Sequence, residues 1–226
     1  MVRKVKTEKG KKKQVKKIII IVLITIILIA LFGFCLWKFV FDKKDNKVAQ
    51  PVKILDSLDE YGYDLSDKDS SYYKKEYESL KSLLKSDNID EKEYSTLVAR
   101  MFTIDLYTLS TKINKYDVGG AEFYHKNKKA MFEQKVMDTL YSTMLDNTFG
   151  DRKQELPEVK DIETVSVEET TYKIDETDVE GYLVKLNITY VKDLNYDTEA
   201  SVVVCKEDGV RWSVVDFQPT LNPKYK

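Results

Sequence analysis

The chain has 226 residues, and its 37 Lys and Arg side chains nearly balance its 38 Asp and Glu side chains. The balance hides an uneven distribution, because residues 1–17 carry nine basic side chains and one acid, a net charge of +8, which leaves −9 for the remainder. Residues 18–37 form a run of 20 residues without a charge. This run excludes a simple soluble cytosolic protein, and the lack of a second such run in the sequence excludes a multi-span channel or transporter.

The uncharged run predicts one transmembrane helix over residues 18–37. At about 1.5 Å of rise per residue it reaches across roughly 30 Å, the thickness of the hydrocarbon core of a bilayer. Basic residues beside a span stay on the cytoplasmic side. The sequence therefore predicts a single-pass protein of the cell membrane, with a cytoplasmic stub over residues 1–17, an extracellular C-terminal part, and membrane lipid as one partner.

A cleaved signal peptide is the alternative for the same segment. Signal peptides have apolar cores of about 7–15 residues and a small-residue cleavage site, neither of which is found here, and Trp37 is typical of an interfacial anchor. Cys35 does not fit a lipid-attachment site, because the small residue required before the cysteine is replaced by Phe34. The basic stub has no aromatic residue for base stacking, so no nucleic-acid partner is predicted.

The segment after the span is polar, and we interpret residues 38–50 as a tether and residues 51–226 as one extracytoplasmic domain. Residues 52–55 are predicted as a short strand or an ordered lead-in, and residues 61–63 as a turn.

Three stretches of helical period follow. The first begins at Ser70 and ends near residues 87–88, and the second begins at a predicted capping residue, Asp90, and runs to Leu109. Because the second is nearly apolar all round from Met101 onward, it is predicted to be the buried central helix. The third is predicted to end at residues 149–150 and has a stripe formed by Phe132, Val136, Leu140 and Met144.

After Pro157 the apolar period changes from 3.6 to 2, which is typical of strands. The predicted strands cover residues 162–174, 182–190, a stretch around 202–204, and 210–215 after a turn at 207–209. The predicted fold class is α+β, with one N-terminal transmembrane helix and then three helices packed on a curved four-stranded antiparallel sheet.

The sequence offers little for catalysis. It has one histidine, no cysteine pair at metal spacing and no glycine-rich phosphate loop. His125 has no nucleophile near it and is interpreted as a surface or partly packed residue. Residues 175–181 are interpreted as an acidic hairpin turn, because a calcium loop would need its glycine one position earlier and a closing glutamate. Cys205, in a predicted strand, is too far from Cys35 for a disulfide. We therefore predict no enzyme, no catalytic, cofactor-binding or metal-binding residue, and no cofactor.

Asp105 lies on the apolar stripe of the second helix, where a lone carboxylate is costly. Arg100 is near in sequence but on another face. We expect Asp105 to be a satisfied core residue, bonded to a tyrosine hydroxyl or to a loop amide.

The layout resembles the nuclear-transport-factor-like extracytoplasmic domains of bitopic proteins, in particular the inner-membrane assembly component of type IV secretion and conjugation machines. Residues 97–102 look like the helix that packs into the sheet of that family, and residues 211–214 look like its last strand. Residues 117–123 and 152–157 resemble uncharacterised envelope proteins of low-GC Gram-positive bacteria. The resemblance implies scaffolding of an envelope complex and carries over no functional residue.

We therefore expect a membrane-anchored interaction or scaffold domain of a bacterial envelope complex, with other envelope proteins as partners and the possibility of a homo-oligomer. The alternative is a small-ligand-binding module at the outer face of the membrane, and an enzyme comes third. The three differ in what the concave face of the sheet should hold. A scaffold predicts packed apolar side chains, a ligand-binding module a cavity with a few polar groups, and an enzyme a titratable pair.

Overall fold

The computed structural model describes residue 17 and residues 20–34, 52–207 and 209–219. The chain divides into two compact units, Met1–Lys47 and Val48–Lys226. In the first unit, residues 20–34 form a helix whose residues are all exposed. Within the described ranges, no helix has both the length and the apolar character needed to cross a membrane. The two ends of the predicted span, nearly all of the basic stub and the predicted tether lie outside the described residues.

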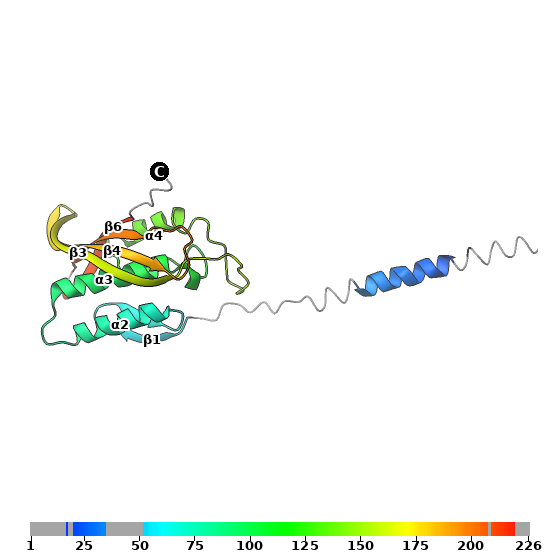
Figure 1. The fold of residues 1–226 in the computed structure, drawn as a ribbon, viewed down its shortest axis with the longest axis horizontal. Helices are drawn as coiled ribbons and strands as arrows, with labels where there is room; N and C mark the ends of the chain where they lie inside the picture. The colour runs from blue at the N-terminus through cyan, green and yellow to red at the C-terminus, as the bar shows by residue number, and fades with distance from the viewer. Residues whose placement is uncertain (1–16, 18–19, 35–51, 208, 220–226) are drawn as a thin grey trace, which may run out of the picture. The chain divides into compact units, whose positions relative to one another are not determined.

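The second unit is an α+β fold with two antiparallel sheets (Figure 1). The smaller sheet pairs β1 (Ile54–Leu58) with β2 (Tyr63–Ser66). Strand β1 overlaps the predicted strand at residues 54–55 only, and the turn covers residues 59–62, so that Tyr63 belongs to β2. The larger sheet has four strands in the order β3-β4-β5-β6, so that each strand pairs with the one before it in the chain. The bounds of these strands are β3 Val159–Ile174, β4 Thr177–Tyr190, β5 Glu199–Lys206 and β6 Trp212–Pro219.

The helices begin where the sequence predicts. Ser70 caps α2 (Ser71–Leu84) by accepting a hydrogen bond from the Tyr73 amide, and Asp90 caps α3 (Glu91–Tyr107) by accepting one from the Glu93 amide. The remaining helical segments are η1 (Leu109–Thr111), η2 (Ala121–Phe123) and α4 (Lys129–Asp138).

Helix α3 is the centre of the core, as its sequence predicts. It packs against all four strands of the larger sheet and, on its other side, against α2. Figure 1 shows α3 between the sheet and a layer that contains α2 and β1. The three helices therefore do not all lie directly on the sheet. An all-round apolar helix has two faces to bury, and the second face is covered by α2.

Strand β4 shows the predicted alternation. Val184, Leu186 and Ile188 are buried, whereas the residues between them are exposed. The turn before β4 contains only Asp175 and Glu176, both with positive φ, so most of the acidic stretch predicted as a hairpin turn is strand instead.

Helix α4 is shorter than predicted, because it ends at Asp138 and not at residues 149–150. Thr139 leaves the helical conformation, with φ −121° and ψ −88°. Two residues later the fully buried Tyr141 donates a hydrogen bond from its hydroxyl to the carbonyl of Leu106, at 2.8 Å. Burial of this ring against the end of α3 stabilises the unwound chain more than a further helical turn would.

Candidate functional site

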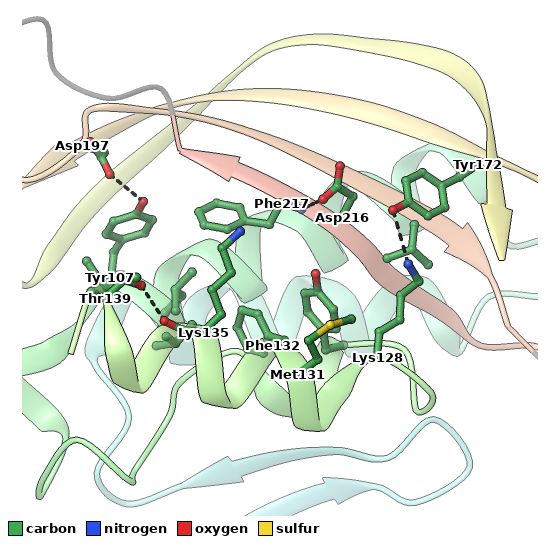
Figure 2. Close-up of a pocket in the computed structure, with 15 residues that line it drawn as sticks. Tyr107, Lys128, Met131, Phe132, Lys135, Thr139, Tyr172, Asp197, Asp216 and Phe217 are labelled. Atoms are coloured by element: carbon green, nitrogen blue, oxygen red, sulfur yellow. Dashed lines mark hydrogen bonds between the residues drawn. The ribbon is translucent and has the colours of Figure 1, made fainter. Parts of the chain in front are cut away.

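A cavity of about 440 Å³ lies between α4 and the end of β6 (Figure 2). We call it the α4 cavity. The C-terminal end of α3, Tyr172 of β3 and Asp197 of the β4–β5 loop complete its walls. Most of its lining is apolar or aromatic, and four charged side chains contribute to it, namely Lys128, Lys135, Asp197 and Asp216.

The spacing of residues on α4 creates one wall of the cavity. Lys128, Met131, Lys135 and Thr139 follow one another at intervals of three or four residues, so their side chains lie along one face of the helix. Phe132 on the same face is buried, whereas Met131 is 70% exposed. This face therefore has an apolar base and an open edge.

Aromatic rings form the base of the cavity. The rings of Tyr124 and Phe132 are stacked, with centroids 4.2 Å apart. Phe217 contacts Phe102 edge-on at 5.3 Å and Tyr107 at 6.1 Å. These contacts hold the rings in defined positions, so the apolar surface is preformed.

Three of the four charged side chains of the α4 cavity have a partner. The Lys128 ammonium lies 4.9 Å from the centroid of the Tyr172 ring and 3.3 Å from its hydroxyl oxygen. Asp197 accepts a hydrogen bond from the Tyr107 hydroxyl at 3.2 Å. Burial, together with the nearby Asp197 carboxylate, raises the pKa of Tyr107 well above its usual value, so this hydroxyl stays a donor.

Asp216 accepts a hydrogen bond from the amide of Phe217 at 2.9 Å. Lys135 differs from these three residues, since no hydrogen bond or ion pair of its ammonium is found within the described part of the chain. Figure 2 shows its side chain extending from α4 to Phe217, over the cavity.

A second polar region surrounds Asp105. Its carboxylate accepts a hydrogen bond from the Gly120 amide at 2.6 Å and forms an ion pair with Lys112. The Tyr141 hydroxyl accepts a hydrogen bond from the Gly119 amide at 3.3 Å. We call these five residues the Asp105 cluster. The expectation of a satisfied core carboxylate bonded to a loop amide is confirmed.

Lys112 is the residue of this cluster that sequence reasoning missed. Its side chain is only 11% exposed. Burial alone lowers the pKa of a lysine, but the adjacent Asp105 carboxylate outweighs this effect and holds the pKa of Lys112 above its usual value. Lys112 is therefore charged and forms a buried ion pair with Asp105.

His125 is buried, so the part of the prediction that placed it at the surface is wrong. Its Nδ1 accepts the Asn127 amide at 3.3 Å, and its Nε2 lies 3.9 Å from a carboxylate oxygen of Glu207. Glu207 also accepts hydrogen bonds from the Ser213 hydroxyl and the Lys126 amide. The backbone of His125 donates to Val214, which brings the residue against β6 and explains its burial.

Cys205 is a buried, free cysteine in β5, as its strand pattern predicts. Burial raises the pKa of its thiol to about 11. Gly181 of β4 pairs with it, and a side chain at this glycine would approach the Cys205 sulfur to 2.6 Å. Cys35 lies outside the described residues.

Glu122 is a further carboxyl group with an unusual environment, which no sequence pattern predicted. It accepts a hydrogen bond from the Tyr73 hydroxyl at 2.6 Å. Burial raises its pKa to about 7, and the nearby Asp105 adds to the effect. In the ranges that the structure describes, no group of three or more His, Cys, Asp or Glu side chains is arranged to hold a metal ion.

Comparisons of the chain with protein-family models, with curated proteins and with solved structures gave no significant match. The resemblance to the assembly component of conjugation machines therefore stays a prediction.

Proposed function

We propose that the protein is a membrane-anchored module that binds a small apolar ligand in the α4 cavity. One observation carries this proposal, namely a preformed aromatic cavity with a few charged groups at its edge. Its volume of about 440 Å³ falls within the range of ligand-binding pockets, roughly 300–1,000 Å³. The sequence-based criterion for a ligand-binding module was a cavity with a few polar groups on the concave face of the sheet, whereas packed apolar side chains were expected there for a scaffold. Strands β3 and β6 of that sheet contribute to the lining of the α4 cavity.

A charge placed in the apolar wall tests this function. Leu140 is half-buried and lines the cavity, so Leu140→Asp should abolish ligand binding. Leu145 is 60% exposed and does not line the cavity, so Leu145→Asp is the matched control. A fluorescent apolar probe would be titrated into the full-length chain in nanodiscs, with empty nanodiscs as background. Equal probe binding by both variants and the parent chain would contradict the proposal.

The anchor is part of the same proposal. It is supported by the uncharged run over residues 18–37, by the helix over residues 20–34 and by the exposure of that helix. The charge of +8 on residues 1–17 favours a cytoplasmic N-terminus. Protease added to intact protoplasts should then digest the second unit. Protection of that unit would overturn the orientation.

A scaffold is the second candidate function, and the outer edge of β3 favours it. Near its start, the edge is covered because the Tyr72 hydroxyl bonds the backbone of Ile162, and the Arg100 guanidinium donates to its carbonyl at 2.8 Å. Arg100 in turn forms a two-pronged ion pair with Glu76 of α2. In the described structure, the backbone of residues 166–174 has no hydrogen-bond partner beyond β4. A free strand edge is a site for pairing with another protein.

Photo-crosslinking in cells tests the scaffold. A photoreactive amino acid at Val165, which is 57% exposed on β3, should capture a partner protein. The control carries the same photoreactive amino acid in place of Lys185, which is exposed on the neighbouring strand β4. The same products from both positions would argue against strand pairing at this edge.

A further inference from the structure

The charges of the α4 cavity point to a class of ligand, an inference that rests on the proposed binding function. The two lysines and two aspartates of the lining sum to zero. Lys128 is held by Tyr172, Asp197 by Tyr107, and Asp216 by the backbone of its own strand. Only the ammonium of Lys135 lacks a partner in the described part of the chain. A ligand therefore meets one ammonium that has no hydrogen-bond partner of its own, whereas the other three charged groups are each hydrogen-bonded to a neutral group.

The position of Lys135 suits contact with the head of a ligand whose body lies in the cavity. Lys135 is exposed, and its methylene stem extends from α4 to Phe217 in Figure 2. A lysine in this arrangement covers apolar surface with its stem and keeps its ammonium in water. The ammonium is thus free to bind an anion at the mouth of the cavity.

The two aspartates limit the charge of that anion. Asp197 and Asp216 both line the cavity, and carboxylates repel a second negative charge on the same ligand. A phosphate dianion or a polyanion is disfavoured for this reason, whereas one negative charge matches the one unpaired ammonium. The head is expected to be a monoanion, such as a carboxylate.

The walls indicate the rest of the ligand. Helix α4 has ten residues and is therefore about 15 Å long. Cavity-lining residues extend from Lys128, just before the helix, to Thr139, just after it. The aromatic base presents a continuous apolar strip without an unpaired buried charge. A slender apolar chain buries more of this strip than a compact polar metabolite does.

We propose that the α4 cavity binds a single-chain amphiphile with one negative charge, of which a free long-chain carboxylate is the simplest example. The head is bound by Lys135, and the chain lies between α4 and β6. Membrane phospholipids, which carry two chains, are a different source of apolar ligand and are treated as an alternative outcome of the test.

Photoaffinity labelling tests this proposal on the full-length chain in nanodiscs of a zwitterionic phospholipid. The probes are dodecanoate, dodecanol and dodecylamine, each with a diazirine in the chain. We expect dodecanoate to label peptides of α4 and β6 about fivefold more than dodecylamine, the gain typical of an ion pair at a partly exposed site. Lys135→Gln should reduce dodecanoate labelling to the level of dodecanol and leave dodecanol labelling unchanged.

Lys129→Gln provides the matched control, because Lys129 is an exposed lysine of α4 outside the cavity lining. Labelling by dodecylamine as strong as that by dodecanoate, or a dodecanoate preference that survives Lys135→Gln, would overturn the anionic head while leaving a binding cavity. A lack of labelling by all three probes would overturn both this inference and the proposed function. The last comparison uses competitors of the dodecanoate probe. If nanodiscs of a monoanionic phospholipid suppress labelling by this probe, and added free dodecanoate does not, the cavity would be assigned to membrane phospholipid and the single-chain proposal would be overturned.

Discussion

The Asp105 cluster and the α4 cavity both adjoin the C-terminal end of α3, and they use charged side chains in opposite ways. In the cluster, Asp105 and Lys112 are mutually paired, and the remaining acceptor position is filled by the Gly120 amide. In the cavity, open space remains beside the ammonium of Lys135. Buried charges that are fully paired fix one conformation of the chain, whereas an unpaired charge at the edge of a hollow can bind something else.

The largest loss of stability is expected from a substitution of Gly120, the glycine whose amide donates to Asp105. Gly120 has a φ of +77°, and a side chain there would approach the ring of Phe102 to 2.7 Å. Gly120→Ala should lower the free energy of unfolding by about 4 kcal/mol, from backbone strain and overpacking together. Gly150 has a similar φ of +69° and open space around it, so Gly150→Ala should cost only about 1 kcal/mol. Urea unfolding followed by tryptophan fluorescence measures both, and equal losses would disprove the close packing.

Removal of the carboxylate comes second. Asp105→Ala leaves the Lys112 ammonium buried without its counter-charge and the Gly120 amide without its acceptor. We expect a loss of about 3 kcal/mol in unfolding free energy. Glu78→Ala removes an exposed carboxylate from α2 and should change stability by less than about 0.5 kcal/mol. Similar values for the two variants would mean that the cluster does not stabilise the fold.

A dependence of stability on pH is expected from Glu122, next to the cluster. Its pKa is about 7 in the folded chain against 4.5 for an ordinary glutamate. Between these two values the folded state binds more protons at Glu122 than the unfolded state, so the stabilising contribution of Glu122 is complete below about pH 4.5 and is lost as the pH rises through 7. The contribution should amount to about 3 kcal/mol. Glu122→Gln cannot titrate and should lack this fall, and a profile identical to that of the parent chain would contradict the assignment.

The smallest effect is expected in the cavity. Lys135→Gln removes a charge that has no partner in the described structure, so its unfolding free energy should change by less than about 0.5 kcal/mol. Lys112→Gln, in contrast, breaks the buried pair and should cost about 3 kcal/mol. Comparable losses in the two variants, measured in the same urea titration, would erase the distinction between the two regions.

Part of the candidate site is visible in the sequence. The apolar stripe predicted for the third helix includes Phe132, Val136 and Leu140, and all three line the α4 cavity. The opposite wall is not predictable in this way. Asp197 and Asp216 belong to segments far from α4 in the chain, and no local pattern assigns them to the same cavity.

The sequence by itself determined the α+β class, the starts of α2 and α3 at Ser70 and Asp90, and the alternating face of β4. These features depend on residues within a few positions of one another, and local period and capping chemistry are sufficient to fix them. The tertiary structure alone decided where α4 ends, why His125 is buried, and which charges are paired. Tyr141 ends α4 by reaching Leu106, and Lys128 finds Tyr172, 44 residues away. Such partners are set by the packing of distant segments around α3, because a side chain pairs with whatever group the fold brings within hydrogen-bonding distance.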